Sequence, residues 1–162
     1  MKKQVLFSLL ATFAMILILS WQGSSLKTEI TPYGILDLEF AKNEKRLKEI
    51  LSAWDLNKLY QNIYLDFLFI VAYSWFFFCT CKFIAGKRKN KTAVFIGIFI
   101  TSLSLFPGLF DIAENICMLI AVSQKPTFIL YPYYLAFVKF VLAGIILFYI
   151  IVSLPVIFRK EN

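Results

Sequence analysis

The sequence predicts an all-α membrane protein: a bundle of four transmembrane helices with both termini in the cytoplasm (N-in/C-in) and one extracytoplasmic segment that caps it. Three observations predict this fold. Hydrophobic residues make up 60% of the 162 residues, above the roughly 45–50% of soluble domains. The charged residues, 17% of the chain, stand mostly between long apolar runs. The basic residues among them fall on one side if four runs cross the membrane.

We expect a single membrane domain over residues 1–162, with spans at about residues 5–21, 62–81, 92–120 and 133–158. The first run follows two lysines, so a cleaved signal peptide is one interpretation. Trp21 stands where cleavage needs small residues, and the run is long for a signal sequence. We therefore expect the first helix to be retained.

The distribution of lysine and arginine gives the orientation. The predicted cytoplasmic ends carry nine basic residues and one acid, Glu161. The nine are Lys2, Lys3, Lys82, Lys87, Arg88, Lys89, Lys91, Arg159 and Lys160. Residues 22–61 instead carry six acids and six basic residues. This asymmetry explains the net charge of +7 without a nucleic-acid partner. The Lys-rich, Phe-rich composition favours a bacterial inner (cytoplasmic) membrane.

The extracytoplasmic segment, residues 22–60, has two predicted parts. The first begins with a turn at residues 32–34, which contain proline and glycine. After it, apolar residues at positions 36, 38 and 40 alternate with Asp37 and Glu39. Alternation with a period of two predicts a short extended stretch.

The second part is an amphipathic helix. Its apolar residues recur at the spacing of one helical face, and they are Leu47, Ile50, Leu51 and Trp54. Asn43 is its expected N-cap, and Asp55 is the expected cap of the helix that follows. We expect this helix to cap the outer ends of the bundle; lying in the membrane interface is the alternative.

Three spans carry ionisable side chains at a common height. At about 1.5 Å per residue, Asp66 lies about 23 Å from the cytoplasmic end of its span, and Asp111 and Lys139 about 29 Å from theirs. The hydrocarbon core is about 30 Å thick. Glu114 and Asn115 lie one turn beyond Asp111. These groups should therefore meet near the outer surface.

Charges inside a membrane usually mark function. We expect Lys139 to pair with Asp111 or Glu114, and one lysine cannot neutralise three acids. One carboxyl is then protonated, reached by water, or available to a cation or ligand. Residues 107–108, Pro-Gly, should interrupt the helix one turn before the acids. A purely structural ion pair is an alternative interpretation. An ion path is disfavoured because the inner halves of the spans are apolar.

The sequence contains no histidine and three cysteines. The absence of histidine excludes His-ligated haem or zinc and Ser-His-Asp catalysis within this chain. The cysteines have no redox or metal-binding spacing and are interpreted as small apolar residues of the spans. We expect no metal and no cofactor.

Three stretches carry a resemblance to known proteins: residues 32–41 together with Trp54, LDFLFIVAY at 65–73, and FDIAEN at 110–115. They resemble a family of small bacterial four-helix membrane proteins over residues 30–118. The resemblance implies no function, but it implies that one constellation contains Glu39, Asp66, Tyr73, Asp111, Glu114 and Asn115. The architecture is also similar to the emopamil-binding-protein-like group of sterol isomerases and sigma receptors, whose motifs do not match.

The function we predict is binding of a lipid or a small amphipathic or cationic ligand in an outward-facing polar pocket. Its expected lining is Asp66, Tyr73, Asp111, Glu114, Asn115, Lys139, Trp54 and Glu39. A membrane enzyme that uses paired carboxylates on a lipid is one alternative, and the sequence identifies no catalytic residue for it. An accessory or structural subunit, with a membrane protein partner or a second copy, is the other.

Overall fold

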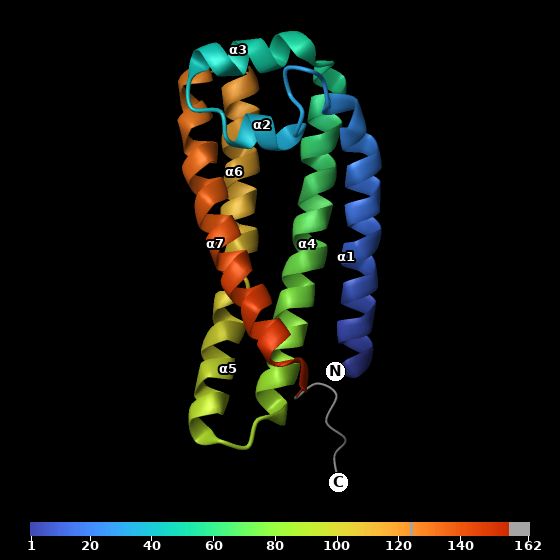
Figure 1. The fold of residues 1–162 in the computed structure, drawn as a ribbon, viewed down its shortest axis with the longest axis vertical. Helices are drawn as coiled ribbons and strands as arrows, with labels where there is room; N and C mark the ends of the chain where they lie inside the picture. Colours follow the sequence, from blue (N-terminus) through green and yellow to red (C-terminus); the bar gives the residue numbers. More distant parts are fainter. Residues whose placement is uncertain (124, 156–162) are drawn as a thin grey trace.

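The structure is a computed structural model that describes residues 1–123 and 125–155. Long helices run side by side, and two short helices lie across one end of them (Figure 1). The long helices are α1 (Lys2–Gly23), α4 (Leu56–Lys87), α5 (Lys91–Leu103), α6 (Phe106–Ser123) and α7 (Leu130–Val152). The short elements are α2 (Ile35–Glu39), α3 (Glu44–Ala53) and the 3-10 turns η1 (Ser24–Leu26) and η2 (Pro126–Ile129). We call residues 24–55 the cap.

Among the described residues, four helical stretches are long and apolar enough to cross a membrane: Lys2–Leu26, Leu56–Lys87, Lys91–Ser123 and Pro126–Val152. The third consists of α5 and α6, which are separated at residues 104–105, so the interruption expected before Pro107 is confirmed. Pro107 stands in the first turn of α6, where the backbone N–H that proline lacks would have had no partner within the helix. Residues 156–158, the predicted end of the fourth span, lie outside the described residues.

Small residues let the helices approach closely. On α1, Ser8 and Thr12 are buried one turn apart, and α1 packs mainly on α4. On α6, a Cβ added to Gly108 would lie 2.2 Å from the hydroxyl of Ser74 on α4. Such contacts between small residues are typical of helix packing in membranes. They hold α1 and α6 on different faces of α4.

The amphipathic cap helix is confirmed. The side chain of Asn43 accepts a hydrogen bond from the backbone of Arg46 at the start of α3. Leu47 and Ile50 are fully buried against the end of the bundle. Asp55 caps α4 in the same way, accepting from the backbone N–H of residue 57. The helix therefore lies across the bundle, as Figure 1 shows.

The predicted extended stretch is wrong: residues 35–39 form helix α2. Leu36 and Phe40, one helical turn apart, are both 39% exposed, whereas Leu38 and Glu39 are buried. Five residues with alternating polarity fit a short helix as well as a strand. Residues i and i+4 lie on one face of a helix, and they also lie on one face of a strand because side chains there alternate with a period of two. The chain reaches α2 through Gly34, whose φ is +63°. This turn directs Glu39 toward α6 and α7.

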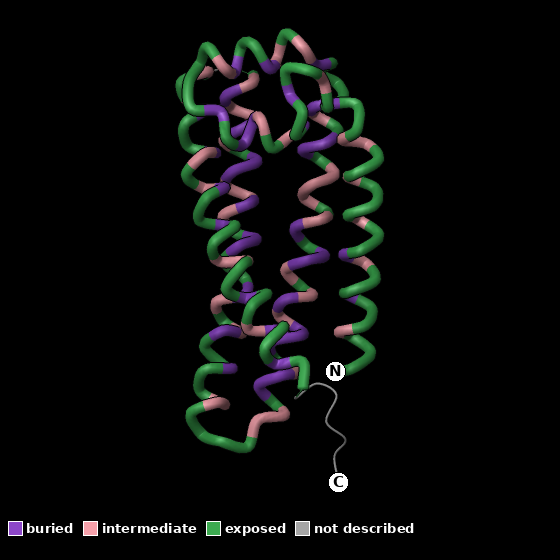
Figure 2. Tube along the Cα trace, viewed as in Figure 1, coloured by how far each residue is buried: buried purple, intermediate pink, exposed green. Residues whose placement is uncertain are grey.

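Two hydrophobic cores occupy the two ends of the bundle. The first lies under the cap and includes Leu38, Ile50, Ile63 and Met118. The second lies further along the bundle, between α4, α5 and α7. Figure 2 shows the buried segments facing the interior along the length of these helices. Along the helices, the ionisable residues of the spans lie between residues of the first core and residues of the second core. Apolar side chains therefore lie toward both ends of the bundle from them.

Candidate functional site

Lys139 of α7 stands at the centre of a charged cluster made of Glu39, Asp111, Glu114 and Lys139. Its Nζ lies 2.8 Å from Oδ1 of Asp111, 2.8 Å from Oε2 of Glu114 and 3.4 Å from Oε2 of Glu39. The ammonium group therefore occupies the position that a cation would take between three carboxylates. The predicted pairing of Lys139 with Asp111 or Glu114 is confirmed with both acids.

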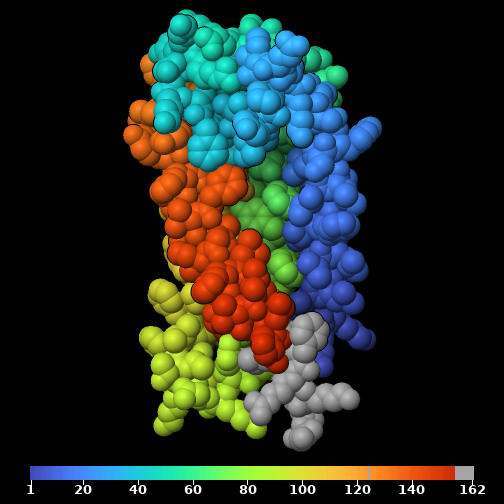
Figure 3. Space-filling view, viewed as in Figure 1, coloured from blue at the N-terminus to red at the C-terminus, as the bar shows by residue number. Residues whose placement is uncertain are grey.

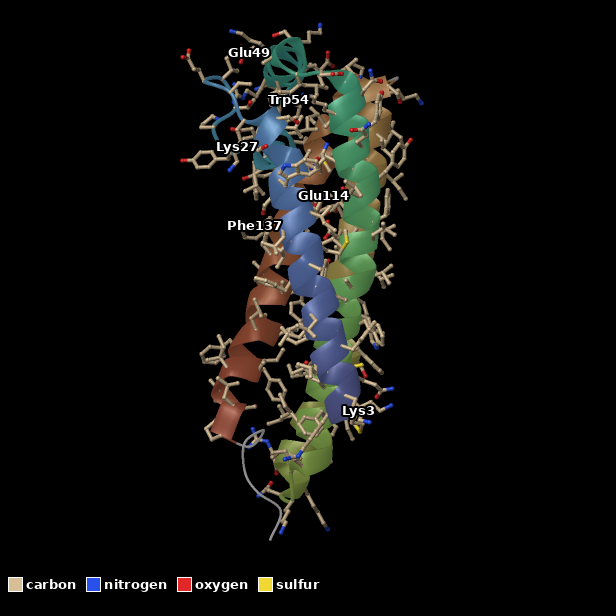
Figure 4. The ribbon with its side chains drawn as sticks, turned by 90° about the vertical axis from the view of Figure 1, so that its right-hand side faces the viewer. Lys3, Lys27, Glu49, Trp54, Glu114 and Phe137 are labelled. Carbon is tan, nitrogen blue, oxygen red and sulfur yellow. The ribbon has the colours of Figure 1, made fainter. Side chains whose placement is uncertain are left out.

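The cluster joins three parts of the chain. Glu39 comes from the cap, Asp111 and Glu114 come from α6, and Lys139 comes from α7. All four are buried, and Glu114 has no exposed surface. Figure 4 shows Glu114 within the bundle, below the cap helix that carries Glu49. A salt bridge therefore ties α2 to the helices beneath it.

Two hydrogen bonds extend the cluster to α4. The hydroxyl of Tyr73 donates to Oδ2 of Asp111 at 2.8 Å. The amide of Asn115 donates to Oδ2 of Asp66 at 2.7 Å. Since Asn115 follows Glu114 directly on α6, the acid of α4 is held next to the charged cluster. All the side chains predicted to meet at one height do meet.

The site contains more carboxyls than cations. Among the described residues, three carboxyls share the ammonium of Lys139, and Asp66 forms no ion pair. Oε1 of Glu114 is buried without a hydrogen-bond partner in the described part of the chain. Burial raises the pKa of Glu39 above its ordinary value; Lys139 opposes this rise and Asp111 adds to it. The arrangement therefore favours a bound proton or a further positive group.

A pocket of about 250 Å³ opens beside Asp66. Its walls come from the end of α1, from the first half of the cap and from α4. The lining residues are Leu19, Ser20, Gly23, Lys27, Tyr33, Gly34, Ile35, Leu36, Asn62 and Asp66. Asp66 is only partly buried. It lines the pocket and also accepts the hydrogen bond from Asn115, so it links the pocket to the side chains of α6.

The structure separates the predicted pocket residues into two groups. Asp66 lines the pocket, whereas the acids and the lysine of the charged cluster, with Tyr73 and Asn115, lie behind it. Trp54 lies in neither group. Its indole N–H donates to the hydroxyl of Thr31 at 2.9 Å in the core of the cap. We expected Trp54 to line the pocket, and its indole instead bonds to another residue of the cap.

Sequence reasoning missed the cap and α1 residues of the pocket. Lys27, Tyr33 and Leu36 reach it because the turn at Gly34 folds the chain back toward α1. Two sequence features belong to these residues: the turn at residues 32–34, which contains proline and glycine, and Lys27, which has no acid at helical spacing. Neither feature by itself indicates a pocket wall.

No family model, curated protein or solved structure matches this chain. The function therefore has to be inferred from the geometry of the site.

Proposed function

We propose that this chain is an integral membrane protein that binds a lipid or another small amphipathic molecule, with a positively charged group of the ligand at Asp66. The observation that carries the proposal is the position of Asp66. It lines an open pocket and accepts a hydrogen bond from Asn115, which follows Glu114 of the charged cluster on α6. That cluster has more carboxyl groups than ammonium groups.

The charge balance supports a cationic group. The ammonium of Lys139 is shared by three carboxyls, so little of its charge compensates Asp66, and Lys27, which lines the same pocket, forms no ion pair with Asp66. Leaving a carboxylate without a counter-charge in a low-dielectric site costs several kcal/mol. A ligand ammonium at Asp66 would remove that cost, and it would reach the acid through the pocket without disturbing Lys139.

The shape of the bundle supports an apolar tail. Figure 3 shows a hollow between α1 and α7, directly below the cap, with α4 at its floor. The pocket shares two of these elements, since Leu19 belongs to α1 and Asp66 to α4. An acyl chain would run from the pocket down this hollow, with its head group beneath the cap.

Charge asymmetry supports the orientation in which the cap is extracytoplasmic. Figure 4 places Lys3 at the end of the bundle opposite the cap. The connection between α4 and α5, which is rich in lysine and arginine, also lies at that end in Figure 1. Short basic connections mark the cytoplasmic side. The pocket then opens at the outer leaflet, and the composition favours a bacterial inner membrane.

The test is lipid retention by the purified protein. The wild type, Asp66→Asn and the control Glu49→Gln would be incubated in mild detergent with equal amounts of phosphatidylethanolamine, phosphatidylglycerol and phosphatidylcholine. Glu49 is an exposed carboxyl of α3 that does not line the pocket. Retained lipid would then be counted by native mass spectrometry, and the melting temperature measured with and without lipid.

We expect about one retained lipid per chain and a lipid-dependent rise in melting temperature for the wild type and for Glu49→Gln. Asp66→Asn should lose about tenfold in retention, the usual effect of removing one charged hydrogen-bond partner. The proposal is wrong if the wild type retains no lipid, or if Asp66→Asn and Glu49→Gln retain the same amount. Chemical conversion of the added lipid would instead assign a catalytic use to the same carboxyls.

A further inference from the structure

The pocket has a positive wall as well as a negative one. Lys27 lies in the cap segment that follows η1, and it lines the pocket together with Asp66 of α4. Lys27 is exposed and forms no ion pair with any residue in the described ranges. Figure 4 shows it at the cap end of α1. Its charge is therefore available to a bound molecule.

The turn at Gly34 positions this lysine. A Cβ at Gly34 would lie 3.4 Å from Cγ of Lys27, so the stem of the lysine packs over the bare backbone of the glycine. The φ of +63° at Gly34 is a conformation that other residues rarely adopt. The stem is thus held against the turn where Lys27 lines the pocket.

The size of the pocket limits what can fill it. Pockets for drug-sized ligands measure about 300–1,000 Å³, and this one measures about 250 Å³. It therefore holds a head group and not a whole lipid. Two opposite charges on its walls call for two opposite charges on that head group.

We propose that the pocket selects a zwitterion that carries a primary ammonium and a phosphate diester, the chemistry of a phosphoethanolamine head group. The ammonium contacts Asp66 and the phosphate contacts Lys27. This inference rests on the proposed function and narrows it to one ligand class. An anionic head group, such as phosphoglycerol, would leave Asp66 facing a neutral or negative group.

The lining favours a primary ammonium over a quaternary one. Trimethylammonium groups are recognised by cages of several aromatic rings. Tyr33 is the one aromatic residue that lines this pocket. Asp66 uses Oδ2 to accept from Asn115, and its second oxygen can accept from an N–H of the ligand. A primary ammonium has such N–H donors, and choline has none.

The same head group exists on a membrane lipid and on soluble glycerophosphoethanolamine, and the experiment separates the two. Wild type, Asp66→Asn, Lys27→Gln and the control Lys45→Gln would each be given one probe at a time. The probes are phosphatidylethanolamine, phosphatidylcholine and phosphatidylglycerol with identical acyl chains, and soluble glycerophosphoethanolamine. Lys45 is an exposed lysine of α3 outside the pocket. Retention is measured by native mass spectrometry, and folding by the melting temperature without added lipid.

We expect the wild type and Lys45→Gln to retain phosphatidylethanolamine about tenfold better than the other two lipids, because one charged hydrogen bond distinguishes them. Asp66→Asn should abolish this preference. Lys27→Gln should weaken retention of phosphatidylethanolamine about threefold, as expected for an exposed ion pair. Retention of soluble glycerophosphoethanolamine alone would assign the pocket to a soluble ligand of the same chemistry and overturn the lipid as its source.

Equal retention of the three lipids, lowered equally by Asp66→Asn, would overturn the zwitterion and leave the proposed function standing. Retention of no probe would overturn both. Lys27→Gln keeps the Cβ and Cγ that pack at Gly34 and removes the charge of an exposed side chain, so it tests the proposal even if Asp66→Asn fails to fold. Unchanged retention of phosphatidylethanolamine by Lys27→Gln, equal to that of Lys45→Gln, would also count against it.

Discussion

Removing Lys139, the one buried cation in the described part of the chain, should destabilise the protein more than any other single change in the site. Lys139→Met keeps an unbranched side chain that is one heavy atom shorter and removes its charge. The ammonium lies 2.8 Å from Asp111, 2.8 Å from Glu114 and 3.4 Å from Glu39, and Lys139 is only 8% exposed. Removing one partner from a buried charge pair costs about 3–5 kcal/mol. That is a large part of a typical total stability of about 5–15 kcal/mol.

The loss should depend on pH in a definite direction. A carboxylate that loses its counter-charge can take up a proton instead, and proton uptake is easier at low pH. The difference between Lys139→Met and the wild type should therefore be larger at pH 8 than at pH 5. At about 2–4 °C per kcal/mol for a chain of this length, the melting temperature should fall by roughly 10 °C at pH 8.

Thermal unfolding in a mild detergent measures this loss, with Lys45→Met as the control for an exposed lysine. Adding Asp111→Asn and Glu114→Gln to Lys139→Met removes the stranded charges as well, and should restore most of the stability. The reasoning is refuted if Lys139→Met melts with the wild type at pH 8, or if the triple variant is no more stable than the single one.

Four further variants test the packing and the cap. Gly97→Ala should cost about 1–3 kcal/mol, because its new Cβ would lie 2.8 Å from the Cβ of Ala85. Gly144→Ala, with no atom within 4 Å, should melt like the wild type, and equal melting temperatures for both variants would contradict the packing. Trp54→Phe loses the indole hydrogen bond inside the cap and should cost about 1 kcal/mol in chemical denaturation. The raised pKa of Glu39 means that the folded state binds a proton there more readily than the unfolded state, so this group destabilises the fold as pH rises above the ordinary glutamate range. Glu39→Gln should flatten that part of the stability–pH curve, and an unchanged curve would show that this group does not titrate on unfolding.

The convergence of the charges could be predicted because a membrane span fixes height. Counting residues along helices placed Asp66, Asp111 and Lys139 near one level. Charged side chains within a span usually face the interior of the bundle and pair with one another, so these groups were expected to meet. The N-caps Asn43 and Asp55 were also predictable, since an N-cap depends only on neighbouring residues.

The pocket could not be predicted, because it depends on how the cap folds back. Sequence periodicity over five residues did not distinguish a strand from α2, so Leu36 and Glu39 were assigned to faces of the wrong element. The resemblance to a membrane-protein family, and not the geometry, grouped Glu39 with the acids of the spans. Trp54 was expected to line the pocket, but its indole N–H donates to the hydroxyl of Thr31 inside the cap.

A structure of the protein determined in a lipid bilayer containing phosphatidylethanolamine tests the central claim most directly. The account predicts a head group in the pocket beside Asp66, with an acyl chain in the hollow between α1 and α7. An empty pocket, or α1 packed against α7 so that the hollow is closed, would contradict it.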